Sequence, residues 1–204
     1  MKDKNPNQRT RYINTTTALK AECDVCVTSS SAVKIVSSLE NKRILFIPDK
    51  NLGSYIAEKL PDKEFIFWDG CCPVHDSVTA ADVKKAKEKY PSALLAVHPE
   101  CKKEVSEQAD FVGATSAIIK FALESDRDIL VGTERGVADY LKIKHPERNF
   151  YQLCEDKLVC PDMKYTSIET VYKALSSDGG EKIEIEEEIR LKAKKCIDEM
   201  LRRG

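Results

Sequence analysis

The sequence predicts an α/β protein made of two similar three-layer α/β domains with parallel sheets, followed by C-terminal helices. Short apolar runs alternate with amphipathic stretches along most of the chain, which is typical of parallel sheets covered by helices. A strand–helix unit recurs after about 85 residues, which indicates an internal duplication. The residues after 180 combine dense charge with apolar side chains at helical spacing. These three observations together define the fold class.

Eight short apolar runs predict the strands. Each is bounded by polar or turn-forming residues, as buried strands are. They cover residues 11–13, 24–27, 43–47, 65–68, 93–97, 110–112, 128–131 and 150–153. The amphipathic stretches between them predict helices, and most of these begin just after a residue that commonly caps a helix. The predicted helices cover residues 31–39, 52–60, 80–89, 102–108, 116–123, 137–143 and 168–176.

The internal repeat is visible in two stretches. Residues 23–25 and 30–33 (Cys-Asp-Val, Ser-Ser-Ala-Val) return as 109–111 and 115–118 (Ala-Asp-Phe, Thr-Ser-Ala-Ile). Residues 51–53 and 55–56 return in the same order as 134–136 and 140–141. Generic strand–helix segments can match by chance, but the shared order favours a duplication. We therefore predict one repeat at residues 1–75, a second at 76–160, and a C-terminal helical segment at 161–204.

The C-terminal segment differs from both repeats. Residues 181–203 predict one long, solvated helix with a narrow apolar stripe. The stripe consists of Ile183, Ile185, Ile189, Ala193, Ile197 and Leu201. Because neither repeat obviously needs this helix, the stripe indicates a surface that packs against something else.

Composition narrows the class of protein. The 204 residues include 42% hydrophobic and 33% charged side chains, with a net charge of −1. No apolar run is long enough to span a membrane, and no face of one charge suggests nucleic acid, so we expect a small-molecule ligand. Residues 1–11 do not resemble a secretory signal, and we expect a cytoplasmic location. In that reducing compartment the eight cysteines are thiols or metal ligands rather than disulfides.

Polar side chains gather where the predicted strands end. Ligands of open parallel sheets bind at this edge, where helix N-termini offer free N–H groups. The residues there are Tyr12, Asn14, Thr28, Ser29, Asp49, Asn51, His98, Glu100, Ala114, Thr115, Thr133, Glu134 and Arg135. The hydroxyls of Ser29 and Thr115 suit a phosphate or carboxylate, although both could equally be ordinary helix N-caps. His98 and Glu100 suit general acid–base chemistry, or else form a capped surface turn.

Two loops carry candidate metal ligands. Cys71, Cys72 and His75 follow an apolar strand, and Cys160 precedes a proline, as the last ligand of bacterial ferredoxins does. From the residues alone these thiols could instead be buried packing groups, and zinc remains open. Cys23 and Cys26 form the only C-x2-C pair, but they lie on a predicted buried strand and we interpret them as core.

Taken together, these segments resemble quinolinate synthase along essentially the whole chain. The matching strings are residues 12–15 (Tyr-Ile-Asn-Thr), 24–30, 46–53, 68–75, 98–101 (His-Pro-Glu-Cys), 109–118, 132–136 (Gly-Thr-Glu-Arg-Gly) and 160–163 (Cys-Pro-Asp-Met). Their common order is highly specific. The resemblance implies an enzyme of NAD biosynthesis that condenses iminoaspartate with dihydroxyacetone phosphate to give quinolinate, losing phosphate and water. L-Aspartate oxidase is then a candidate partner, as the source of iminoaspartate.

The resemblance also implies a cofactor and a set of site residues. Three similar α/β domains surround a [4Fe–4S] cluster, and each contributes one cysteine; the matching residues are Cys72 and Cys160. The fourth iron would be open to substrate. Tyr12 and Asn14 would hydrogen-bond the substrate, and Ser29 and Thr115 would hold its phosphate or carboxylate groups. His75, His98 and Glu100 would line the reacting end, with Glu100 as the candidate acid–base.

The departures from the family pattern matter as well. Family members begin with a further domain of roughly 80–100 residues; we expect this chain to start after that domain, so that the third cysteine ligand is absent. The segment 161–204 would pack on that domain, and the chain alone would be weakly active or inactive. A non-catalytic α/β module that binds a phosphorylated metabolite, with structural cysteines, is the alternative function. A zinc hydrolase is more distant, because the three histidines are scattered.

Overall fold

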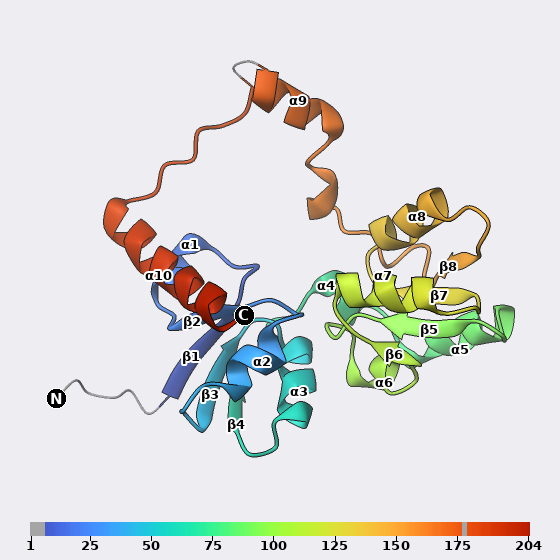
Figure 1. The fold of residues 1–204 in the computed structure, drawn as a ribbon, viewed down its shortest axis with the longest axis horizontal. Coiled ribbons are helices and arrows are strands. Elements are labelled where there is room, and N and C mark those ends of the chain that lie inside the picture. The colour runs from blue at the N-terminus through green and yellow to red at the C-terminus, as the bar shows by residue number, and fades with distance from the viewer. Residues whose placement is uncertain (1–6, 177–178) are drawn as a thin grey trace.

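The computed structural model describes residues 7–176 and 179–204 and contains two four-stranded parallel sheets (Figure 1). The strand orders are β2-β1-β3-β4 and β6-β5-β7-β8, so the second sheet repeats the plan of the first. The strands are β1 (Asn7–Tyr12), β2 (Val25–Val27), β3 (Arg43–Ile47), β4 (Glu64–Phe67), β5 (Leu94–Val97), β6 (Phe111–Val112), β7 (Ile129–Gly132) and β8 (Phe150–Gln152). The predicted fold class is confirmed, and each predicted strand is present.

The described helices include every helix predicted inside the two repeats. They are α1 (Thr17–Ala21), α2 (Ala32–Ser37), α3 (Lys50–Lys59), α4 (Pro73–Asp76), α5 (Ala80–Lys89), α6 (Lys103–Ser106), α7 (Thr115–Glu124), α8 (Arg135–Lys144), η1 (Asp162–Lys164, a 3-10 helix), α9 (Ile168–Ser176) and α10 (Glu187–Arg203). Sequence reasoning missed α1, α4 and η1. Each is one turn or little more, too short for a helical hydrophobic period to show.

Side chains of the second sheet alternate between its two faces, and helices cover both. Leu95 and Val97 of β5 pack with Val83 of α5 and Val105 of α6. The intervening Ala96 packs on the opposite face, among residues of α7 and α8. This alternation follows from the two-residue period of a strand. The second repeat is therefore a three-layer unit with a hydrophobic core on each side of its sheet.

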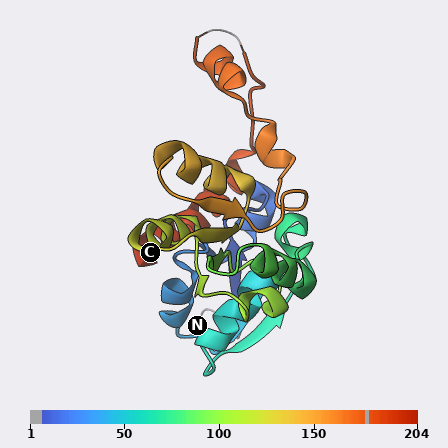
Figure 2. The same cartoon turned by 90° about the vertical axis from the view of Figure 1, so that its right-hand side faces the viewer.

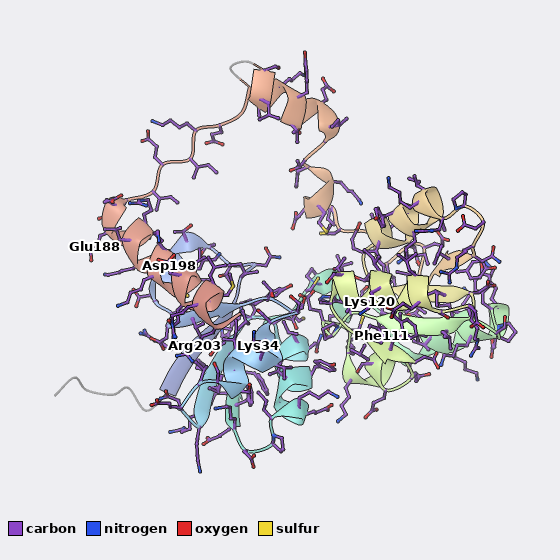
Figure 3. The ribbon with its side chains drawn as sticks, viewed as in Figure 1. Lys34, Phe111, Lys120, Glu188, Asp198 and Arg203 are labelled. Carbon is purple, nitrogen blue, oxygen red and sulfur yellow. The ribbon has the colours of Figure 1, made fainter. Side chains whose placement is uncertain are left out.

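The first sheet is covered differently on its two faces. One face packs against α2 and α3 through a core that includes Ile35, Ile44 and Ile56. The other face meets α1 and the distant helix α10, where the buried thiols of Cys26 on β2 and Cys196 on α10 lie 3.1 Å apart. Figure 3 labels Lys34 on α2 and Arg203 at the end of α10. Arg203 donates to the carbonyl and hydroxyl oxygens of Ser38, just beyond α2.

The C-terminal helix is shorter than predicted. It begins at Glu187, so Ile183 and Ile185 lie outside it and are exposed. Within α10 the buried residues are Ala193 and Cys196, whereas Leu201 of the predicted stripe is exposed. Within this chain α10 lies against α1 and β2. The expected contact of residues 161–204 with a further domain stays a prediction, as do the predicted domain boundaries.

Helix α9 stands away from both sheets (Figures 1 and 2). Ile168, Tyr172 and Leu175 on this helix are exposed. Its apolar stripe has no buried residue, in contrast with α10. In the part of the chain that the structure describes, no helix is both long and apolar enough to cross a membrane.

Candidate active site

The candidate site lies where the carboxyl ends of the two sheets meet. Tyr12 ends β1, whereas His98 and Glu100 follow β5. Hydrogen bonds join the repeats there; among them, His98 Nε2 lies 3.3 Å from Ser29 Oγ, and Asn51 Nδ2 donates to the Glu100 carbonyl at 3.0 Å. Helix α4 sits at this junction (Figure 1). The strand-end position that the sequence indicates is therefore one shared location rather than two separate edges.

His75 is the centre of a buried hydrogen-bond network. Its Nδ1 lies 3.0 Å from Glu100 Oε2 and 3.2 Å from Cys72 Sγ. Its Nε2 lies 3.0 Å from the Thr133 hydroxyl, at the end of β7. The short helix α4 makes this possible, because Pro73 stabilises its first turn and Cys72 precedes it as the N-cap. His75 thus links both repeats and both kinds of candidate residue, the thiol and the carboxylate.

The two histidines of the site have opposite electrostatic environments, although their rings stack with centroids 4.9 Å apart. Burial lowers the pKa of His75, but hydrogen bonds to Cys72 and Glu100 outweigh it, and the pKa rises to about 9. Burial lowers the pKa of His98 to about 4; the Glu100 carboxylate opposes this shift, and the charge on His75 adds to it. Near neutral pH the site therefore holds one imidazolium and one neutral imidazole side by side.

Glu100 is the carboxylate of this network. Burial alone would raise the pKa of Glu100, but His75 and His98 together lower this pKa by a larger amount. The net pKa therefore lies below the ordinary glutamate range. Burial and the Glu100 charge raise the pKa of Tyr12, whose phenol is hydrogen-bonded to Glu100. His98 and Glu100 are only 5% and 6% exposed, so their interpretation as a surface turn is wrong. The site therefore combines two proton acceptors, Glu100 and neutral His98, with two proton donors, charged His75 and the Tyr12 phenol.

The predicted substrate-binding residues Ser29, Asn14 and Thr115 differ in whether they contact the network. Ser29 contacts His98 within the network. Asn14 and Thr115 are exposed, and no described contact brings either of them to the network. The N-cap interpretation of Ser29 and Thr115 is wrong, because the N-cap positions of α2 and α7 are occupied by Ser31 and Ala114. Whether Asn14 and Thr115 bind substrate stays a prediction.

The two cysteines proposed as ligands share a setting. Cys72 and Cys160 are half-buried and pack against the same hydrophobic cluster, whereas Cys101 and Cys154 belong to its buried core. Burial raises the pKa of Cys101 to about 12 and that of Cys154 to about 11, so both remain thiols. Of the neighbouring pair 71 and 72, Cys72 is the one that reaches His75. The sequence alone did not distinguish these two.

A mixed set of donor atoms also lies within the network. Ligand atoms of Cys72, His75 and Glu100 are within 4.8 Å of one another. Sulfur, imidazole nitrogen and carboxylate oxygen are all donors that zinc accepts. This mixed group could therefore hold a metal ion.

Several residues that contact the site were recognised only as strand-end residues. The Thr133 hydroxyl is hydrogen-bonded to His75 Nε2, and the Asn51 side-chain amide donates to the Glu100 backbone carbonyl. Asp49 and Glu134 accept hydrogen bonds from the backbone N–H groups of Cys72 and Cys160. The signal available in the sequence was their position after β3 and β7. What it did not contain was the partner of each side chain, which lies far along the chain.

Comparison with known proteins places the chain in a family. The family model described as Quinolinate synthetase A protein matches residues 1–202. The curated quinolinate synthase of Clostridioides difficile (strain 630) is 50% identical over 183 residues, which cover 89% of this chain and 60% of that protein. The quinolinate synthase of Clostridium novyi (strain NT) is 45% identical over 203 residues, covering 98% of this chain and 66% of the relative.

A third relative agrees with these two. The quinolinate synthase of Caldicellulosiruptor saccharolyticus is 47% identical over 191 residues, with 93% of this chain and 62% of the relative covered. The chain thus spans between 60% and 66% of the length of these three curated relatives. The resemblance found in the sequence is confirmed at the level of the family: this chain belongs to the quinolinate synthetase A protein family.

Proposed function

We propose that this chain supplies the greater part of the active site of a quinolinate synthase, which condenses iminoaspartate with dihydroxyacetone phosphate to quinolinate in NAD biosynthesis. The observation that carries the proposal is the buried network of Glu100, His75 and His98 at the junction of the two sheets. Family membership supports the reaction class. The substrates, the cytoplasmic location and L-aspartate oxidase as a source of iminoaspartate stay predictions.

The protonation states of the network suit this reaction. Forming a ring with loss of phosphate and water requires protons to be taken from carbon and nitrogen and given to departing oxygens. The charged His75, held by Glu100 and Thr133, can protonate a departing oxygen. The neutral His98 and the Glu100 carboxylate can accept protons. The positive charge on His75 and the hydroxyls of Ser29 and Tyr12 also favour binding of anionic substrates.

The residues fit a thiolate-bound cofactor. Cys72 and Cys160 are half-buried thiols from the two repeats against one hydrophobic cluster, and sulfur donors suit an iron–sulfur cluster. A [4Fe–4S] cluster with one iron not bound by cysteine supplies a Lewis acid toward substrate. We infer that the third cysteine lies in the part of the relatives that this chain does not match. On that basis we expect little or no turnover by the chain alone.

A second candidate centre is favoured by one observation. The donor atoms of Cys72, His75 and Glu100 cluster within 4.8 Å, a set that can hold a single divalent ion such as zinc. In that case Cys160 would not be a ligand. The two candidates differ in their dependence on His75 and Cys160, and this difference makes them separable.

The decisive experiment measures iron, acid-labile sulfide and zinc per chain after anaerobic reconstitution. We expect about four iron and four sulfide per chain in the wild type and in the matched control Cys71→Ser. Both Cys72→Ser and Cys160→Ser should abolish binding. One zinc per chain that is lost in His75→Gln but kept in Cys160→Ser would favour the mononuclear site. A metal-free, folded protein that binds a phosphorylated metabolite would favour the non-catalytic module.

A further inference from the structure

Two buried carboxylates occupy equivalent places in the two repeats. Asp49 follows β3 and is the N-cap of α3; Glu134 follows β7 and is the N-cap of α8. They are 3% and 5% exposed, respectively. Helix N-caps are usually solvated Ser, Thr, Asn or Asp side chains, for which a single acceptor oxygen is sufficient. Two acidic caps this deeply buried therefore indicate a role beyond capping.

Asp49 divides its two oxygens between a helix and a loop. Oδ1 accepts the N–H groups of Asn51 at 2.7 Å and Leu52 at 2.9 Å, which is ordinary capping of α3. Oδ2 accepts the N–H of Cys72 at 2.5 Å, 23 residues further along the chain. One carboxylate thus ties the loop that carries Cys72 to the N-terminus of α3.

Glu134 repeats this arrangement in the second unit. Oε2 accepts the N–H of Gly136 at 2.7 Å, which caps α8. Oε1 lies 3.4 Å from the Cys160 nitrogen, whose N–H it accepts, and 2.8 Å from Lys164 Nζ. A Cβ at position 136 would lie 2.9 Å from Oε2, so glycine permits the close approach. The second unit therefore also has an acidic cap whose second oxygen contacts a cysteine loop.

We propose that Asp49 and Glu134 are matched positioning residues, each of which fixes one cysteine loop against a helix of its own repeat and so orients the thiols of Cys72 and Cys160. Orientation of the backbone holds whether or not metal is present; its use in holding a metal centre rests on the proposed function. A carboxylate is required because it accepts from the helix and from the loop at once. An amide would place an NH2 group against one of these N–H donors.

The experiment compares alkylation rates of Cys72 and Cys160 by iodoacetamide in the metal-free chain, read by peptide mass spectrometry. A Cys71→Ser background makes residue 72 the only thiol of its pair. We expect Asp49→Asn to speed alkylation of Cys72 about fivefold, the equivalent of one lost hydrogen bond, and to leave Cys160 unchanged. Glu134→Gln should speed Cys160 about twofold, because its contact is longer, and leave Cys72 unchanged.

Two controls separate positioning from general destabilisation. Thr79 caps α5 through its side chain in the same way but contacts neither cysteine loop, so Thr79→Ala should loosen a helix without changing either alkylation rate. Asp49→Ser keeps a capping oxygen for α3 and removes only the loop contact. It should therefore behave like Asp49→Asn, and it keeps the test valid if the asparagine variant does not fold.

The outcomes are distinct from those that test the proposed function. Rates that rise equally at both cysteines, or that also rise in Thr79→Ala, would overturn the positioning role whatever metal the protein binds. If each variant speeds alkylation of its own cysteine only, while the wild type binds no iron, the positioning role is supported and the proposed iron–sulfur cluster is overturned. In reconstituted protein we expect chelator to bleach the absorbance near 400 nm several times faster in Asp49→Asn than in Thr79→Ala.

Discussion

The two α/β units share a strand order but differ in how their sheets are covered. The second sheet has its own helices on both faces, α5 and α6 on one and α7 and α8 on the other. The first sheet has its own α2 and α3 on one face, whereas its other face depends partly on α10, from the far end of the chain. The two units therefore share a topology but not the same source of stability, because the first unit completes its core with α10 from the far end of the chain.

The largest expected effect comes from detaching α10. Ala193 on this helix is buried, so Ala193→Asp places an unpaired charge between α10 and the first unit and should lower the free energy of unfolding by about 3 kcal/mol. Hydrogen exchange should rise in β1–β3 but not in β5–β8. Leu191→Asp, at an exposed position of the same helix, is the matched control. Equal loss of protection in both sheets would contradict the comparison.

A smaller effect is expected from two glycines, one in each unit. A Cβ on Gly132 in β7 would lie 2.6 Å from Val97 Cγ1 and 3.2 Å from the Ala96 carbonyl oxygen. Gly132→Ala should therefore cost about 2 kcal/mol by overpacking. A Cβ on Gly53 in α3 would lie 2.8 Å from the ring of Phe67, which is partly exposed and can move, and 2.9 Å from the ring of Phe46, which is fully buried. Alanine favours the helix by about 1 kcal/mol, which offsets part of this clash. Chemical denaturation should therefore show a smaller loss for Gly53→Ala than for Gly132→Ala; a larger loss would contradict this order.

The stacked histidines, one from each unit, predict opposite pH dependences in the metal-free chain. The folded-state pKa of His75 is raised to about 9, so its stabilising contribution is complete below pH 6.5 and is lost between about 6.5 and 9. That of His98 is lowered to about 4, so its contribution is present above about 6.5 and is lost toward pH 4. Because they share Glu100, we expect each loss to be about 1–2 kcal/mol.

Unfolding free energies measured across pH would test this. His75→Gln should flatten the alkaline limb only, and His98→Gln the acidic limb only. Histidine NMR titrations provide the independent check, with one ring titrating well above and the other well below pH 6.5. Two ordinary titrations would show that the network of Glu100 does not separate the two rings.

The smallest effect concerns the polar contacts at the end of α10, where Figure 3 labels Lys34 and Arg203. Lys34 Nζ donates to the Gly204 carbonyl at 2.8 Å, and Arg203 donates to Ser38; both contacts are exposed. Lys34→Ala and Arg203→Ala should each change thermal stability by less than about 1 kcal/mol. A loss as large as that of Ala193→Asp would mean that α10 is held by charge rather than by its buried face.

Much of the site was predictable because parallel sheets bring strand ends together. Tyr12, His98 and Glu100 were expected at strand ends from that rule, and they lie together in one network, whereas their roles stay predictions. Asn14 and Thr115 follow the same rule but are exposed, because a strand-end position does not determine which way a side chain points. Thr133 was recognised only as a strand-end residue, since its role depends on His75, which lies in a turn too short to show a periodic pattern.

The sequence by itself determined the fold class, the repeat, the strands and the strand-end location of the site, because hydrophobic period and chain order are local properties of the residues. Only the tertiary structure decided which face α10 covers, that Asp49 reaches Cys72, and that His75 and His98 have opposite pKa shifts. Those features depend on burial and on distances between residues far apart in the chain. Neither quantity exists until the chain has folded.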